Sequence, residues 1–251
     1  MSSLAISLIV FACVFGGALL GMFLRGVLPE HHLSAESKGT VNLGIGLIGT
    51  MAALVLGLLV ASAASSYNAQ KDELTQVSAQ FVLLDRLLAH YGPESKLPRD
   101  TLRNRVAGLL DQLWPQERSS GSQLAPSAGS GEVLYDEIQQ LSPQNDTQRS
   151  IKGQALGVAL DVGKTRWLMY EQGSVPVPTT FLVVVVFWLT VVFASYGLHA
   201  PRNPTVMFTL FLCALSFAGA ILLILELYKP FEGLIQISSA PLRNALAQMG
   251  K

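Results

Sequence analysis

The sequence predicts an all-α membrane protein with four transmembrane helices and a cytoplasmic helical domain between the second and the third helix. Three observations support this prediction. Half of the 251 residues are hydrophobic (50%) and only 14% are charged, against about 25% charged residues in an average soluble domain. Four apolar stretches are long enough to cross a hydrocarbon core of about 30 Å. The charged residues are concentrated between the second and the third stretch.

The first two stretches cover residues 4–28 and 41–66 and make up the first predicted domain, residues 1–66. The first stretch has no basic residue before it, and it is about twice as long as the apolar core of a signal peptide. We therefore expect a retained transmembrane helix. The second stretch is rich in glycine and alanine, and its helix is expected to continue beyond the membrane.

Residues 67–177 make up the predicted cytoplasmic domain. The helix that leaves the second span carries apolar residues at alternating spacings of three and four: Leu74, Val77, Phe81, Leu84, Leu88 and Tyr91. This stripe is typical of a helix that packs along one face. Its partner is another helix of an antiparallel bundle, another subunit, or both.

Three further helices are predicted in this domain. They run from about Pro98 to Pro115, over residues 132–141, and from Asn145, a good N-cap residue, toward Pro176. The intervening residues 119–131 are rich in glycine and serine, and we expect a flexible loop there.

The third and fourth stretches, residues 178–198 and 205–228, complete the membrane part at residues 178–228. The tail, residues 229–251, is predicted to contain a short helix with Ser238 or Ser239 as N-cap and Pro241 in its first turn. The Gly-Leu-Ile-Gln-Ile run before this helix is apolar. We therefore expect the tail to lie along the membrane interface or to dock on the cytoplasmic helices.

The distribution of basic residues predicts the orientation. Four crossings place both termini and the large segment on one side. Within about 20 residues of a span, that side carries Lys71, Arg86, Lys164, Arg166, Lys229 and Arg243, while the other side carries Arg25, Lys38 and Arg202. The positive-inside rule therefore predicts cytoplasmic N- and C-termini in a bacterial inner membrane.

Small residues recur at every fourth position of the second span. They are Gly49, Ala53, Gly57, Ala61 and Ser65. Such a face allows another helix backbone to approach closely. The partner is a helix of the same subunit or of another subunit, and the pattern does not choose between them. Gly17 and Gly21 form a shorter face of the same kind in the first span.

Polar side chains within spans are the default positions for function. In the second span these are Asn42, Thr50 and Ser62, which we predict to line a pore if one exists. Glu226, near the end of the fourth span, is predicted to pair with Lys229 or Arg243, or to reach the interface.

The sequence predicts no enzyme, cofactor or metal site. Residues 44–49 spell G-x-G-x-x-G, but they lie inside a span without a preceding strand. The far-side acids and histidines match no metal-ligand spacing: Glu30, His31, His32, Glu36 and His199. Seventeen basic and seventeen acidic residues give no indication of a nucleic-acid partner. The expected partners are the lipid bilayer, further copies of the chain and inorganic ions.

Several segments resemble a known family. These are Thr-Met-Ala-Ala-Leu-Val-Leu-Gly-Leu-Leu-Val-Ala-Ser-Ala (50–63) with Ser66-Tyr67-Asn68, Leu-Leu-Asp-Arg (83–86), Tyr-Gly-Pro-Glu (91–94), Pro-Phe-Glu-Gly-Leu-Ile (230–235) and Ser-Ser-Ala-Pro-Leu (238–242). They are similar to the bacterial membrane family labelled bestrophin-like. The resemblance covers nearly the whole chain except the Gly/Ser loop. It implies kinship with bestrophin anion channels, in which a ring of subunits lines a central pore.

The chain departs from true bestrophins in two respects. No acidic cluster that resembles a calcium clasp follows the last span, and residues 41–66 contain no phenylalanine. No pore or calcium residue can therefore be carried over. Our leading interpretation is a homo-oligomeric ion (anion) channel or pore. The alternative is a non-conducting scaffold or signalling protein whose cytoplasmic stripe, including Phe81 and Leu84, binds a partner.

Overall fold

A computed structural model describes most of the chain. The described residues are 2–27, 35–115, 130–173, 179–201, 203–231 and 233–250. Within them the chain is mainly helical, including the short 3-10 helix η2 (Pro93–Ser95), and has no strand. The chain divides into two compact units. The first unit comprises residues 1–67 and 176–229, and the second comprises residues 68–175 and 230–251.

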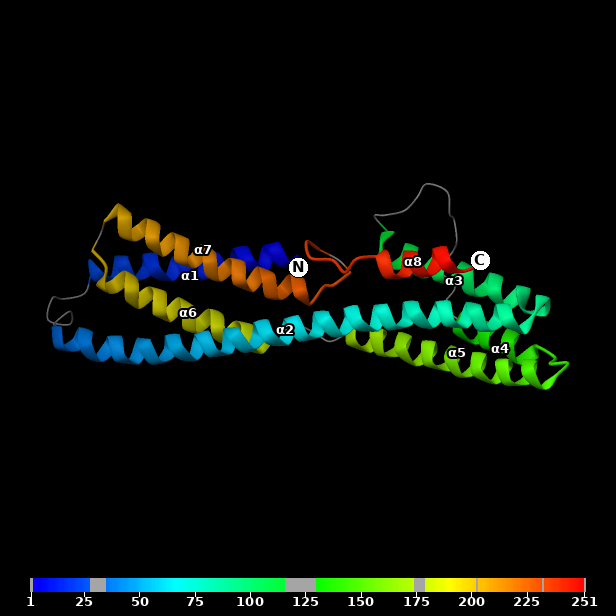
Figure 1. Ribbon diagram of the computed structural model, residues 1–251. Helices are drawn as coiled ribbons and strands as arrows, with labels where there is room; N and C mark the ends of the chain where they lie inside the picture. Colours follow the sequence, from blue (N-terminus) through cyan, green and yellow to red (C-terminus); the bar gives the residue numbers. More distant parts are fainter. Residues whose placement is uncertain are drawn as a thin grey trace. The chain divides into compact units, whose positions relative to one another are not determined.

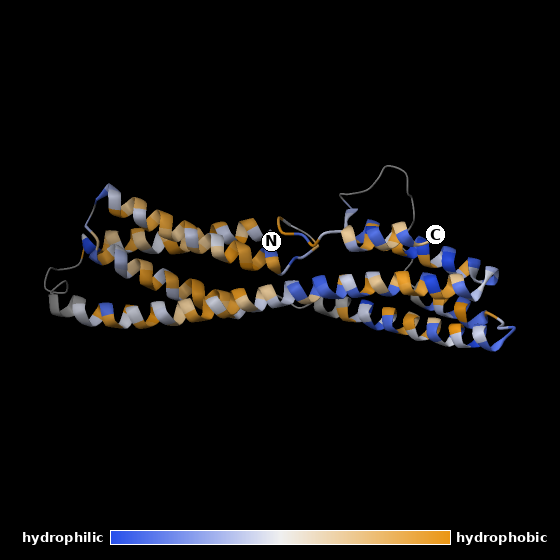
Figure 2. Cartoon of the chain, in the orientation of Figure 1, coloured by the Kyte–Doolittle hydropathy of each residue, from blue (hydrophilic) through white to orange (hydrophobic). Residues whose placement is uncertain are grey.

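The first unit contains the membrane-spanning helices. They are α1 (Ser3–Arg25), α6 (Thr179–His199), α7 (Pro204–Leu227) and the N-terminal part of α2 (Ala35–Tyr91). All four helices are long and apolar enough to cross a membrane, and Figure 2 shows their hydrophobic colouring. The expectation of an all-α membrane protein with four spans is therefore confirmed among the described residues.

The core of the first unit lies where α1 packs against α6 and α7 (Figure 1). Its most deeply buried members are small or β-branched: Val14, Ala18, Ala63, Val185, Ala214, Ile221 and Ile224. Aromatic rings pack beside it, with the ring centres of Phe11 and Phe211 5.3 Å apart. Cys13 and Cys213 are free and exposed on the surface of this unit.

The ends of the spans follow the sequence closely. The helices α6 and α7 begin and end within one residue of the predicted stretches. The helix α1 ends at Arg25, three residues before the predicted end, because the backbone N–H of Gly26 bonds to the carbonyl of Phe23. Arg25 reaches across to donate a hydrogen bond to the carbonyl of Ala200, just after α6.

The helix α2 is continuous over 57 residues. The prediction that the helix of the second span continues past Ser66 is therefore confirmed. Its part in the second unit buries the whole predicted stripe: Leu74, Val77, Phe81, Leu84, Leu88 and Tyr91 are at most 5% exposed. The stripe thus packs inside the subunit, as expected for an antiparallel bundle.

The remaining helices of the second unit are α3 (Lys96–Leu113), α4 (Ser130–Gln140), α5 (Asp146–Gly173) and α8 (Ala240–Gln248). Their buried side chains include Leu102, Val106, Ile138, Ala155 and Leu242. Figure 2 shows that these helices mix hydrophilic and hydrophobic residues, whereas the membrane-spanning helices are mainly hydrophobic.

Local hydrogen bonds explain where these helices begin and end. The Asn145 side chain accepts a bond of 2.8 Å from the backbone N–H of Gln148, so Asn145 is the N-cap of α5 as predicted. Lys152 donates to the carbonyls of Gln139 and Leu141 at 2.7 and 2.9 Å and so satisfies the C-terminal end of α4. The predicted loop at 119–131 lies almost entirely outside the described residues.

Candidate functional site

The small-residue face of α2 is open within the subunit. Ala53, Gly57, Ala61 and Ser65 are exposed, and Gly49 is half-buried. A Cβ atom added at Gly49 or Gly57 would meet no described atom within 4 Å. Among the described residues, therefore, no helix of the same subunit packs on this face.

The glycines of α1 are used in the opposite way. A Cβ atom at Gly21 would lie 1.8 Å from the carbonyl oxygen of Ala194, and one at Gly17 would lie 2.8 Å from that of Thr190. These glycines therefore hold the backbones of α1 and α6 in contact. Their partner across the contact is Gly197, where a Cβ atom would lie 2.0 Å from the carbonyl oxygen of Ala18. Sequence analysis missed Gly197, whose only signal is the Ala194-x-x-Gly197 spacing.

Sequence analysis also missed a ridge of bulky apolar residues on α2. Five bulky apolar side chains, which are between 43% and 80% exposed, run beside the small residues: Leu43, Leu47, Met51, Leu54 and Leu58. A span that is apolar on all faces gives no periodic signal, because lipid-facing and protein-facing positions have the same composition. The exposed surface of α2 therefore has a stripe of small residues next to a ridge of bulky apolar residues.

The polar residues of the predicted pore lining occupy different environments on α2. Asn42 is exposed. The hydroxyl of Thr50 donates to the carbonyl of Gly46 at 2.8 Å, so its proton is used within the helix. The hydroxyl of Ser62 lies 3.3 Å from that of Tyr228, next to the end of α7. All three remain on the open face or its border, and their role as lining stays a prediction.

Glu226 is 5% exposed near the end of α7. Lys229 follows it and is half-buried, while Arg243 lies on an exposed face of α8. The ion pair of Glu226 with Lys229 or Arg243 stays a prediction.

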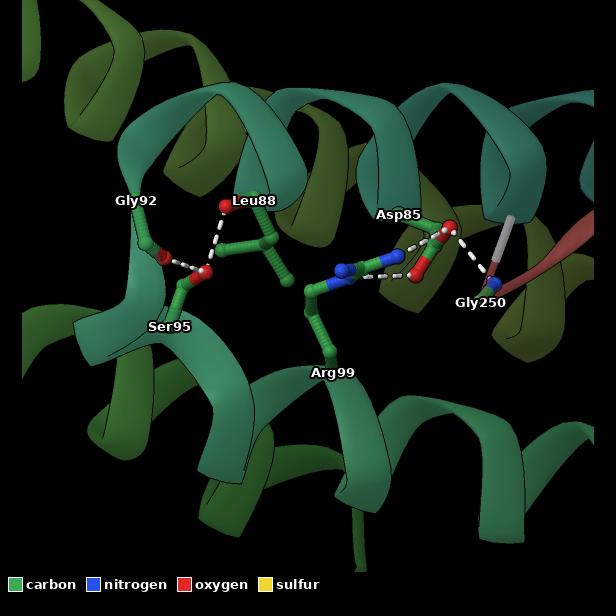
Figure 3. A network of polar contacts seen from close by, with 6 residues as sticks. All are labelled: Asp85, Leu88, Gly92, Ser95, Arg99 and Gly250. Carbon is green, nitrogen blue, oxygen red and sulfur yellow. Dashed lines mark hydrogen bonds and ion pairs between the residues drawn. The ribbon is translucent and has the colours of Figure 1, made fainter.

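The second unit contains a buried polar network that joins three segments (Figure 3). The Asp85 carboxylate of α2 is 3% exposed. It accepts hydrogen bonds from Nε and Nη2 of Arg99 at 2.9 and 3.1 Å, and from the backbone N–H of Gly250 at 3.2 Å. The hydrogen bond to Asp85 raises the pKa of Arg99 above its ordinary value. This network fastens α3 and the end of the tail to α2.

The tail docks on the second unit, which was one of its two predicted positions. The indole N–H of Trp114 donates to the carbonyl of Ile237 at 2.9 Å. The Trp114 and Phe231 rings meet edge to face, with 5.7 Å between their centres. Leu242 and Met249 of α8 are buried. The predicted start of this helix is also confirmed, because Ser239 is its N-cap and Pro241 lies in its first turn.

The buried stripe also limits the scaffold hypothesis. Phe81 is 5% exposed and Leu84 is fully buried. They stabilise the bundle and offer no surface to a partner, so these residues were a wrong choice for a docking surface.

Residues 44–49 lie in the interior of α2. Because α2 runs through these residues without interruption, they do not form the strand-to-helix loop that binds phosphate.

Of the far-side histidines, His199 is described. Its Nδ1 atom lies 2.8 Å from the carbonyl oxygen of Ser195, one turn back along α6. Glu30, His31 and His32 lie outside the described residues, as does the side chain of Glu36. The part of the chain that the structure describes brings no three metal-ligating side chains together.

Comparison with known proteins was made at the level of family, sequence and fold. A family model described as the Bestrophin-like domain matches residues 12–242. Two crystal structures of mutants of a bacterial Bestrophin homolog from Klebsiella pneumoniae have a similar fold. One has a TM-score of 0.68 and 17% identity and covers 100% of this chain and 99% of that chain. The other has a TM-score of 0.63 and 16% identity and covers 95% and 99%. At these identities the likeness shows the fold alone.

Two curated relatives share part of the sequence. Each is a High frequency lysogenization protein HflD homolog from a strain of Klebsiella pneumoniae. Each is 34% identical over 116 residues, which is 46% of this chain and 47% of the relative. The chain therefore spans about half the length of these curated relatives.

Proposed function

We propose, from the premise that the chain belongs to the bestrophin-like family, that it forms a homo-oligomeric pore for anions in which α2 of each subunit borders the central axis. The subunit has no enzymatic role in this proposal. We further propose that it resides in a bacterial inner membrane with both termini in the cytoplasm, as the distribution of basic residues predicts.

The open small-residue face of α2 carries the proposal. Lipid gives no hydrophobic reason for helices to associate, so small residues are favoured where two backbones meet closely. The face that runs from Gly49 to Ser65 has no such neighbour among the described residues of the subunit. A second copy of the chain supplies one. The adjacent ridge of bulky apolar residues, Leu43 to Leu58, provides side chains that can pack against the small-residue face of another subunit.

The polar groups on this face favour a particular assignment of roles. An anion is solvated by N–H and O–H donors. The Thr50 proton is already donated to Gly46. The Asn42 amide carries two N–H donors and is exposed. Asn42 is therefore our first choice for an anion-contacting residue, and Asn42→Ala is expected to lower the ratio of chloride to potassium flux.

The decisive experiment measures ion flux from the full chain in liposomes together with its oligomeric mass in detergent. Gly57→Leu is the test variant. The added side chain meets no described atom of its own subunit, so we expect the subunit to fold while assembly and flux are lost together. Gly219→Leu is the matched control, because Gly219 on α7 is exposed and equally open. This control is expected to assemble and conduct as the unchanged chain does.

Three results would count against the proposal. A folded monomer in detergent and in bilayers would remove the need for the α2 contact. Equal effects of Gly57→Leu and Gly219→Leu would assign the loss to general changes of the lipid-facing surface. A defined oligomer that is silent to chloride, other anions and cations would favour a non-conducting scaffold.

A further inference from the structure

A groove between α1 and α6 is open on the surface of the first unit. It has a volume of about 640 Å³ and is lined by residues within 6–20 of α1 and 182–190 of α6. Val10 and Leu182 are buried at its floor, whereas Phe187 is exposed at its rim. The groove lies entirely within the first unit, and both of its helices are long and apolar enough to span a membrane.

The glycine contact between α1 and α6 closes one end of the groove. A Cβ atom at Gly17 would meet Thr190, and one at Gly21 would meet Ala194, so the two helices run parallel with their backbones in contact. Most of the lining residues precede this contact, and the groove therefore extends toward the beginnings of both helices. It is about 21 Å long between residues 6 and 20, because a helix rises about 1.5 Å per residue.

The lining of the groove suits an apolar ligand. None of the described residues that line it is charged. The hydroxyl of Thr190 donates to the carbonyl of Val186 at 2.7 Å, so its proton is used within α6. The thiol of Cys13 is only a weak hydrogen-bond donor. The groove therefore offers a volume in the range of about 300–1,000 Å³ that is common for small-molecule sites, without a strong donor for a polar ligand.

The surroundings of the two helices identify this ligand as a lipid tail. A membrane-spanning helix presents its apolar side chains to acyl chains, which take the place of water. Ile6 and Leu182 each lie three residues after the start of their helices. The end of the groove that they line is therefore near one boundary of the hydrocarbon core, where an acyl chain begins.

A helix of a second copy fits this groove less well than a lipid tail. A helix about 10 Å wide and about 21 Å long occupies about 1,600 Å³, which exceeds the volume of the groove. Helix contacts in membranes also favour small residues, whereas the exposed Ile9, Val183 and Phe187 are bulky and lie at the rim. An acyl chain is narrow and flexible, so it can reach the closed end at Gly17.

We propose that the groove between α1 and α6 binds one acyl chain of a membrane lipid, which enters at the beginnings of the two helices and ends at the Gly17 contact. The chain is as apolar in the bilayer as in the groove, so the gain comes from van der Waals packing against the groove walls. The groove goes beyond the proposed function, because it requires neither α2 nor conduction. A monomer or a silent oligomer would leave it unchanged.

The first test is native mass spectrometry of the full chain after addition of palmitoyl-oleoyl phosphatidylglycerol and detergent exchange, which removes loosely held lipid. Gly16 lines the groove, and a Cβ atom there would meet no described atom within 4 Å. The phenyl ring of Gly16→Phe can therefore enter the groove. We expect the unchanged chain to retain one lipid per subunit and Gly16→Phe to lose it.

Gly219→Phe is the matched control. Gly219 on α7 is exposed and equally open, but it does not line the groove, so this variant should retain lipid as the unchanged chain does. Equal retention by Gly16→Phe and the unchanged chain overturns the proposal. Loss from both variants, or no retention by the unchanged chain, also overturns it. Circular dichroism shows whether Gly16→Phe is folded, and if it is not, the second test decides on the unchanged chain.

The second test compares the two cysteines of the unchanged chain. Cys13 lines the groove, and Cys213 is exposed on α7 outside it. The ring centre of Phe211 lies 5.3 Å from that of Phe11 and 5.6 Å from that of Phe15, so the two thiols lie at nearly the same depth. A phosphatidylcholine with a diazirine in one acyl chain is crosslinked by light, in detergent and at one lipid per subunit. We expect Cys13 to be labelled several times more than Cys213.

Two results of this crosslinking overturn the proposal. Equal labelling of Cys13 and Cys213 would mean that the groove holds lipid no better than the rest of the surface. In bilayers, labelling of Cys13 that appears only after Gly57→Leu has separated the subunits would mean that a neighbouring subunit covers the groove.

Discussion

At the scale of single residues, the second unit contains two kinds of buried polar group. The Asp85 carboxylate accepts three hydrogen bonds from Arg99 and Gly250. The Tyr91 hydroxyl is buried and has no hydrogen-bond partner among the described residues. Burial, followed by the nearby Glu94 carboxylate, raises the pKa of Tyr91 above its ordinary value of 10.0. An unpaired buried hydroxyl costs about 1–3 kcal/mol, so this group opposes folding.

Tyr91→Phe is expected to leave the stability of the protein at neutral pH unchanged or to raise it by about 1 kcal/mol. Because the folded-state pKa of Tyr91 is raised, its protonated form contributes stability that is complete below about pH 10 and is lost as the pH rises through the folded-state value. The unchanged chain should therefore lose stability more steeply above pH 10 than Tyr91→Phe does. Thermal unfolding in detergent, followed by circular dichroism, measures both effects. A destabilised variant with the same alkaline slope would contradict this account.

Gly197→Ala is expected to destabilise the first unit by roughly 1–3 kcal/mol or more, because the new Cβ atom would lie 2.0 Å from the backbone of α1. Backbone atoms cannot move aside as a flexible side chain can. Gly219→Ala on α7 is the control, since its Cβ atom meets nothing within 4 Å, and it should be neutral or slightly stabilising. Unfolding in detergent compares the two. Equal stability of both variants would mean that α1 and α6 are not in backbone contact.

At the scale of elements, two periodic patterns on one helix have different packing partners. The stripe of α2 between Leu74 and Tyr91 packs inside the bundle. The small-residue repeat between Gly49 and Ser65, on the same continuous helix, is largely exposed, and a Cβ atom at Gly49 or Gly57 would meet no described atom within 4 Å. The beginnings and ends of the helices depend on local hydrogen bonds, and Asn145 at the start of α5 is a clear case.

Asn145→Ala is expected to lower the stability of the second unit by about 0.5–2 kcal/mol, because the backbone N–H of Gln148 loses its capping partner. Asn145→Asp keeps a side-chain oxygen at the same position and should retain most of the stability. Hydrogen exchange at the first turn of α5 gives the local readout, with faster exchange expected only in the alanine variant. Similar exchange in both variants would show that the cap contributes little.

At the scale of the whole molecule, the two units differ in the solvent that surrounds them, which is lipid for the first unit and water for the second. The spans of the first unit satisfy their backbone groups internally and present apolar side chains to lipid. The second unit buries an apolar core that includes Leu74, Leu84 and Leu102, and its stability depends on removing these side chains from water. Urea weakens apolar burial from water, and it acts on surfaces that water reaches.

Urea is therefore expected to unfold the second unit in detergent while the spans remain helical. Circular dichroism should show a partial loss of helix, accompanied by changes in the emission of Trp114 and Trp167 but not of Trp188. W188F serves as the control, because removing Trp188 should leave the urea-dependent change in emission intact. A single cooperative loss of all helix and all three signals would show that the units unfold as one.

Length and hydropathy were sufficient to predict the spans and the bundle stripe, and capping residues were sufficient to predict the N-cap of α5 and the start of the tail helix, because each feature depends on residues close together in the sequence. Only the tertiary structure shows which glycines lie at a helix contact. Gly17, Gly21 and Gly197 lie where α1 and α6 meet, whereas Gly49 and Gly57 have open space beside them. The tertiary structure alone showed that Asp85 meets Arg99 and Gly250. Close approach and charge pairing depend on neighbours far away in the chain, which periodicity along one helix does not contain.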